Sequence, residues 1–121
     1  MGYQGHEELI VWQKAMDLVV AVYKLVKKLP KEELYALSDQ MRRAVISIPS
    51  NIAEGQARNS KKEFIQFLSI AQGSRAELQT QLLLCVKLGY VTEVEINNLL
   101  SLTEEVGKML TTFILKLKTK N

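Results

Sequence analysis

Apolar residues recur at alternating steps of three and four along most of this chain, and that spacing constrains its fold more than any other feature. It runs through four segments, at about residues 10–29, 39–54, 61–88 and 93–117. Such steps place side chains on one face of an α-helix, and that face needs an apolar partner. We therefore expect four amphipathic helices. In the first segment the residues that follow this spacing are Val11, Ala15, Leu18, Val22, Leu25 and Leu29.

Helix-ending and helix-starting signals separate the segments. Pro30 ends the first, because the residue before a proline is pushed out of the helical region. Gly55 and Gly89 are expected to cap the second and third. Since short connections make consecutive helices antiparallel neighbours, residues 1–121 should form one all-α domain, an antiparallel up-down-up-down four-helix bundle. Two capping boxes support the later helix starts, Ser60 with Glu63 and Thr92 with Glu95.

Pro49 lies inside the second segment, where it removes the backbone hydrogen bond to the Val45 carbonyl. The alternatives are one helix kinked at Pro49 and two helices broken there. The apolar spacing of Ala44, Ile48 and Ile52 passes through the proline undisturbed, which favours a single kinked helix.

The composition argues against several classes of function. Hydrophobic residues make up 47% and charged residues 24%, as in ordinary globular domains, and no apolar run is long enough to span a membrane. With one cysteine, Cys85, and one histidine, His6, neither a zinc site nor a di-iron bundle site can be built. We expect no metal, no cofactor, no catalytic residues and no enzyme activity. The start of the chain lacks a signal-peptide pattern, so a cytoplasmic location is expected.

A second, polar line adjoins the apolar line of the second segment instead of lying opposite it. Polar groups beside a core need partners, so we expect a buried hydrogen-bond network with the third segment. The antiparallel register brings Arg43 within one turn of Glu77, which indicates an ion pair. The alternative is a general acid/base pair of Glu54 with Glu77, although the register sets these near opposite ends. The residues expected in the network are Arg43, Ser47, Asn51, Glu54, Ser74 and Glu77.

The first segment carries a second apolar line beside the first. It is either a wide core face or a subunit interface. Together with further apolar residues on the third and fourth segments, it exceeds what one four-helix core needs, so we expect a homo-oligomer. The expected interface residues are Trp12, Val19, Val26, Leu83, Val86, Leu100, Met109 and Ile114.

The net charge of +3 is too small to indicate nucleic-acid binding by itself, but its distribution is uneven. The bundle topology brings the second loop, the chain start and the chain end to one end, where the acids are Glu7, Glu8 and Glu63. The opposite end mixes equal numbers of acids and bases. A basic end suits a phosphate backbone; the alternative is a solvated face whose lysines complement a helix dipole. The bases expected there are Arg58, Lys61, Lys62, Lys116, Lys118 and Lys120.

Five stretches of the chain resemble one known family, the four helix bundle protein family, also called the 23S rRNA intervening-sequence protein family. They span about Leu9 to Tyr90, most of the chain, in family order, and the run Asn51-Ile52-Ala53-Glu54-Gly55 is specific. Val45 and Ile46 depart from the pattern, standing where smaller residues are common. The matching stretches are 9–16, 38–44, 47–55, 60–64 and 73–78.

That resemblance implies a four-helix bundle that assembles as a ring-shaped homopentamer. It also implies a bacterial protein of unknown function, encoded within large-subunit rRNA insertions or by free-standing genes, with no established catalysis. The accessory protein of diversity-generating retroelements is similar in fold, pentameric, and binds nucleic acid and reverse transcriptase. The sequence therefore predicts a ring-forming, non-enzymatic adaptor that binds RNA or DNA, or else a purely structural or protein-interaction bundle.

Overall fold

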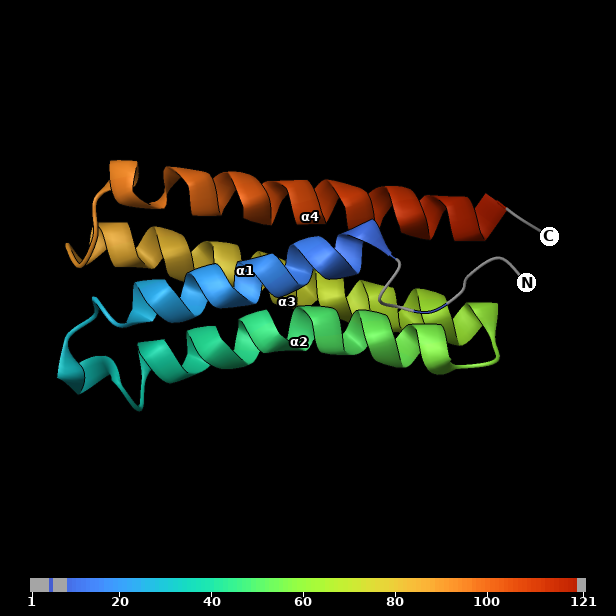
Figure 1. Ribbon diagram of the computed structural model, residues 1–121, viewed down its shortest axis with the longest axis horizontal. Coiled ribbons are helices and arrows are strands. Elements are labelled where there is room, and N and C mark those ends of the chain that lie inside the picture. Colours follow the sequence, from blue (N-terminus) through green and yellow to red (C-terminus); the bar gives the residue numbers. More distant parts are fainter. Residues whose placement is uncertain (1–4, 6–8, 120–121) are drawn as a thin grey trace.

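The computed structural model describes Gly5 and residues 9–119 of the chain. Within that part there are no strands, and the helices lie side by side along one long axis (Figure 1). The α2–α3 loop and the end of α4 share one end of the bundle, and the turns before α2 and α4 share the other. The expected all-α four-helix bundle is confirmed. Its elements are α1 (Ile10–Val26), a 3-10 turn η2 (Lys31–Glu33), α2 (Leu37–Ala57), α3 (Lys61–Lys87) and α4 (Glu93–Thr119).

Each helix packs against two neighbours, so that α1, α2, α3 and α4 close a square around one core. The predicted apolar stripes supply that core. Apolar side chains without any exposed surface come from all four helices, as the three-four spacing requires. Among the largest are Leu18, Met41, Ile48, Ile52, Leu68, Leu78, Leu82, Ile96 and Leu110.

The second helix is continuous through Pro49, which is buried. Two helices broken at the proline are therefore ruled out, while a bend of the axis at Pro49 stays a prediction. The helix also runs past Gly55 to Ala57, so the expectation that Gly55 caps it is wrong. Gly55 instead faces α3, where a Cβ atom would lie 2.7 Å from Cβ of Phe67 and 2.9 Å from Cδ1 of Phe64. Close approach of two helices, not chain reversal, explains this glycine.

The other helix ends follow local signals. Ser60 caps α3 by accepting a hydrogen bond from the Glu63 backbone N–H at 3.2 Å. Gly89 has φ 81° and ends α3 in a left-handed conformation that favours glycine. The first helix stops at Val26 instead of near 29, because residues 27–29 form tighter turns in which the N–H groups of Lys28 and Leu29 bond three residues back.

We predict that Gly55→Ala lowers the free energy of unfolding by about 1–3 kcal/mol, because the added methyl group overpacks the α2–α3 contact. Gly73→Ala is the matched control: Gly73 also lies within a helix, but a Cβ there meets nothing within 4 Å. That variant should gain about 0.5–1 kcal/mol from the higher helix propensity of alanine. Urea unfolding of both variants checks the pair, and a Gly55→Ala protein as stable as wild type would contradict the close contact.

Candidate nucleic-acid interface

One end of the bundle gathers the α2–α3 loop, the first turn of α3 and the last turn of α4 (Figure 1). The acids in this region of the described chain are Glu54 and Glu63. Lys120, Glu7 and Glu8, which the sequence also assigned to this end, lie outside the described residues. The basic side chains that the structure places here are all exposed: Arg58, Lys61, Lys62, Lys116 and Lys118. We call these five residues the basic end.

Arg58 differs from the lysines because its charge is partly compensated. Its guanidinium lies 2.8 Å from the Glu54 carboxylate and 3.6 Å from that of Glu63. The same group stacks over the Phe67 ring, 5.0 Å from its centroid. Arg58 therefore fixes the α2–α3 loop and is less available to a ligand. By contrast, none of Lys62, Lys116 and Lys118 forms an ion pair with a carboxylate in the part of the chain described.

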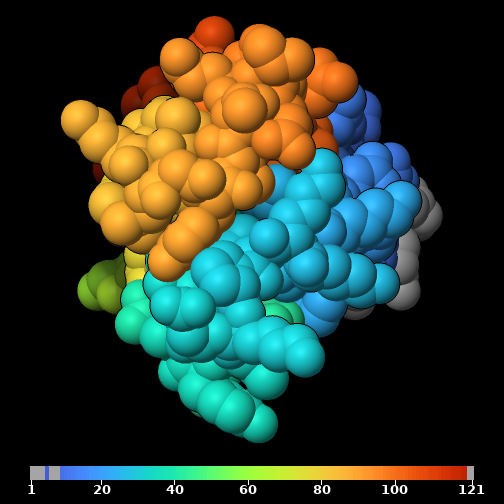
Figure 2. All heavy atoms as spheres, turned by 90° about the vertical axis from the view of Figure 1, so that its left-hand side faces the viewer, coloured from blue at the N-terminus to red at the C-terminus, as the bar shows by residue number. Residues whose placement is uncertain are grey.

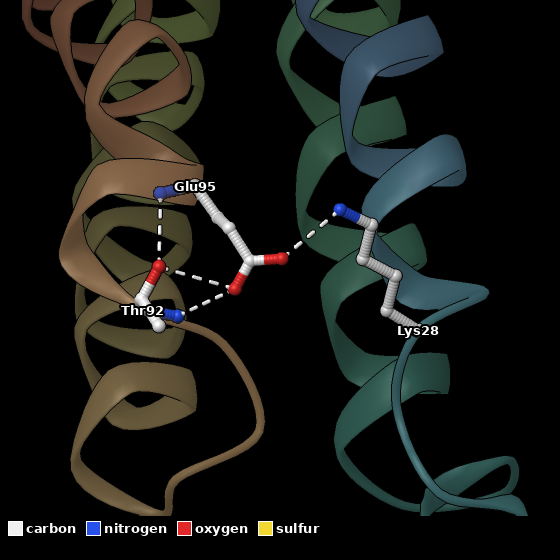
Figure 3. A network of polar contacts seen from close by, with 3 residues as sticks. All are labelled: Lys28, Thr92 and Glu95. Carbon is white, nitrogen blue, oxygen red and sulfur yellow. Dashed lines mark hydrogen bonds and ion pairs between the residues drawn. The ribbon is translucent and has the colours of Figure 1, made fainter.

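The opposite end has balanced charge. Figure 2 shows it, covered by the α1–α2 connection (cyan) and the α3–α4 turn (orange). The Lys28 ammonium lies 3.2 Å from the Glu95 carboxylate (Figure 3). Tyr90 donates a hydrogen bond to Glu33 at 2.6 Å, and this bond raises the pKa of Tyr90 to about 12.

Glu95 also completes the predicted capping box at the start of α4. It accepts from the Thr92 backbone N–H at 2.8 Å, and its own N–H donates to the Thr92 hydroxyl at 3.2 Å (Figure 3). The Thr92 N–H, followed by the Lys28 ammonium, lowers the pKa of Glu95 below its usual value. Glu95 therefore serves both the cap of α4 and the ion pair with Lys28.

Three of the six residues expected in the polar network are brought together. The Ser47 hydroxyl accepts hydrogen bonds from the Asn51 amide at 2.8 Å and from the Ser74 hydroxyl at 2.9 Å. All three side chains are half-buried, and the bonds link α2 to α3. These hydrogen bonds connect α2 to α3 and stabilise the contact between the two helices.

The expected burial of Arg43, Glu54 and Glu77 is wrong for the chain as described, since all three are exposed. Arg43, whose side chain is 79% exposed, donates to Asp39 at 3.0 Å instead of to Glu77. Glu77 accepts from Gln81 at 3.3 Å. Both partners lie four residues away on the same helix, where side chains are neighbours, and this proximity explains both outcomes. Neither the Arg43–Glu77 pair nor a Glu54–Glu77 acid/base pair is formed.

The expected interface residues are mostly part of the core or packed against it. Val26 is buried, and Leu83, at 48% exposure, is the most exposed of the set. The remaining six are partly buried against the core: Trp12, Val19, Val86, Leu100, Met109 and Ile114. The exposed apolar line of α1 consists instead of Met16, Val20 and Tyr23, with Ile46 of α2 also exposed. Val20 was not predicted at this surface, because neighbouring Val19 fits the heptad spacing equally well.

Nothing in the described residues indicates a metal or thiol centre. The described chain holds no group of three or more histidine, cysteine, aspartate or glutamate residues that could ligate an ion. Burial raises the pKa of the Cys85 thiol, whose sulfur lies 3.7 Å from that of Met41 within the core. A search of the described helices for a segment long and apolar enough to cross a membrane finds none.

The fold and its ends define an antiparallel four-helix bundle with one basic end. The model of the 23S rRNA-intervening sequence protein family matches residues 7–112, and the chain therefore belongs to that family. It is similar to the crystal structure of a protein with unknown function from the S23 ribosomal protein family of Bacteroides thetaiotaomicron VPI-5482. The two share 27% identity with a TM-score of 0.81, over 87% of this chain and 98% of that one. The comparison with curated proteins gives no match.

Proposed function

We propose that this protein is a non-enzymatic adaptor that assembles as a homopentameric ring and binds nucleic acid through its basic end. The observation that carries the proposal is the separation of charge between the two ends of the bundle. In the described chain, the bases at one end outnumber the acids there, Glu54 and Glu63, whereas the other end carries equal numbers of acids and bases. The alternative is a purely structural or protein-interaction bundle that does not bind nucleic acid.

Helix dipoles explain only two of the four lysines of the basic end. Lys116 and Lys118 lie in the last turn of α4, where a positive charge complements the dipole. Lys61 and Lys62 lie in the first turn of α3, where a positive charge opposes it. Their presence beside the α4 lysines therefore favours an anionic ligand over simple dipole compensation. A phosphate backbone suits such a surface, because neutralised phosphates release counterions without any reading of bases.

The proposal of a ring is based on apolar side chains that are exposed to solvent in the single chain. Met16, Val20 and Tyr23 form an exposed line on α1, and Leu83 and Leu84 are exposed on α3. Contact between copies would remove these side chains from water. If the bundle axes run along the ring axis, every subunit adds its basic end to the same rim. A cytoplasmic location suits both the nucleic-acid partner and the unpaired Cys85.

Light scattering at micromolar concentration tests the ring. A homopentamer requires a mass near five times the 13.7 kDa of one chain. A single species near 13.7 kDa would contradict assembly, and Val20→Glu, which places a charge in the exposed α1 line, should shift the mass towards that of one chain.

Binding of structured RNA and duplex DNA across a salt series tests the basic end. Wild type should bind both with an affinity that falls steeply as salt rises. A variant with Lys61, Lys62, Lys116 and Lys118 changed to glutamine should bind more weakly and with a shallower salt dependence, because fewer counterions are released.

The matched control removes the same number of exposed lysines from the region of the opposite end, at Lys24, Lys27, Lys31 and Lys87. This variant has the same net charge as the first but should retain wild-type binding. Equal losses in the two variants would show that overall charge, not the basic end, determines affinity. No binding by wild type at low salt would favour the structural or protein-interaction bundle.

A further inference from the structure

An open polar groove lies between α3 and α4, midway along the bundle. Its volume is about 680 Å³, and every residue lining it is polar or glycine. It takes Gln72, Arg75 and Gln79 from α3 and Gly107, Lys108 and Thr111 from α4, among others. This groove is lined by residues other than those of the basic end, and the function proposed above does not depend on it.

Arg75 is held in one orientation within this groove. Its Nε donates to the Gln72 side-chain oxygen at 2.8 Å, and its Nη1 donates to the Gln79 side-chain oxygen. Gln72 is fixed in turn, because its amide donates to the Gly107 carbonyl and to the Thr111 hydroxyl, each at 2.9 Å. A side chain held in this way loses little conformational entropy when it binds a ligand.

The α4 backbone accommodates the guanidinium through a glycine. A Cβ atom at Gly107 would lie 2.8 Å from Nε of Arg75 and 3.0 Å from its Cζ. Glycine inside a helix costs about 0.5–1 kcal/mol relative to alanine. The close approach of Arg75 accounts for a glycine at this position, so the groove and the arginine fit each other.

The charge of this arginine is not compensated. Both of its acceptors are neutral amide oxygens, and no carboxylate in the described part of the chain forms an ion pair with Arg75 or with Lys108. Glu104 also lines the groove but lies beyond ion-pair distance of both. A half-buried guanidinium without a counterion favours an anionic ligand.

Further donors surround the guanidinium. Lys108, which carries an ammonium group, and Thr112, which carries a hydroxyl group, also line the groove. Thr111 accepts its hydrogen bond from Gln72, so its own hydroxyl proton is available to a ligand. After its bonds to Gln72 and Gln79, Arg75 keeps its remaining N–H donors, and Lys108 and the two threonines add more. Together these donors exceed the roughly four lone-pair sites of a carboxylate, whereas a phosphate offers more acceptor oxygens.

We propose that the α3–α4 groove is a phosphate-binding site centred on Arg75, with Lys108, Thr111 and Thr112 as further donors. Glu104 opposes the anion and limits the affinity. The phosphate belongs either to a small phosphorylated molecule or to the backbone of a nucleic acid.

The site is tested by titrating the full chain with inorganic phosphate. Binding is monitored through the NMR signal of the Arg75 Nε–H group. Sodium chloride at matched ionic strength is the reference. Wild type should show a saturable shift that chloride does not reproduce. Arg75→Gln should weaken phosphate binding by about tenfold or more, because a charge-assisted hydrogen-bonding group is lost. In this variant, binding is monitored through the backbone amide signals of residues near the groove. Glu104→Gln should strengthen phosphate binding.

Two further variants distinguish phosphate binding in the groove from a general effect of positive charge on the protein. Gly107→Ala keeps every charge but displaces the guanidinium, so it should weaken phosphate binding while circular dichroism confirms that the bundle is folded. Arg42→Gln removes an arginine of α2 outside the groove and should leave phosphate binding unchanged. A wild-type shift that does not saturate, or equal effects of Arg42→Gln and Arg75→Gln, would overturn the proposal.

A second arm distinguishes the two sources of phosphate. The variant lacking Lys61, Lys62, Lys116 and Lys118 must retain inorganic-phosphate binding, which keeps this test independent of the basic end. A short single-stranded DNA is then titrated into wild type and Arg75→Gln. Weaker DNA binding by Arg75→Gln assigns the groove to a backbone phosphate, and unchanged DNA binding assigns it to a small phosphorylated molecule. Loss of inorganic-phosphate binding in the four-lysine variant would overturn a separate groove site.

Discussion

Burial of the α2 apolar stripe against α3 is the contact on which the rest of this structure depends. Ile48 and Ile52 of α2 and Leu68 and Leu78 of α3 have no exposed surface. At Gly55 the two helices approach so closely that a methyl group does not fit. Because each stripe can be buried only between its neighbours, this hairpin determines where α1 and α4 must lie.

That arrangement in turn decides which charges share a surface. The antiparallel order brings the start of α3 and the end of α4 to one end, so lysines more than fifty residues apart in sequence become neighbours in space. At the other end, the Thr92–Glu95 cap and the Lys28–Glu95 pair use charges to hold connections in place. Bases therefore outnumber acids at one end of the described bundle, and the other end carries equal numbers of both.

Local signals in the sequence were sufficient for the helices and their caps. Ser60, Thr92 and Gly89 act on residues within one turn of themselves, so their roles could be predicted without a fold. The residues of the basic end could also be predicted from the sequence, because the order of the helices alone determines which residues share that end. The partial neutralisation of Arg58 was missed, since Glu54 reaches it only when α2 continues past Gly55.

Features that depend on helix phase and spacing could not be predicted in this way. Val26 lies at the edge of the buried face of α1, whereas Val20 lies on the opposite, exposed face. The apolar pattern alone did not determine where the core face of α1 ends. Arg43 had two acids within reach, and the pairing with Asp39 on its own helix prevailed. The contact of Arg75 with Gly107 joins residues of different helices, and its one sequence signal is a glycine inside a helical pattern.

Photo-crosslinking of the assembled protein to bound RNA, followed by mass spectrometry of the crosslinked peptides, tests most directly whether the basic end is the nucleic-acid interface. We expect crosslinks concentrated in the peptides that contain residues 58–62 and 116–118. Crosslinks concentrated in residues 27–33 and 87–95, at the charge-balanced end, would contradict it.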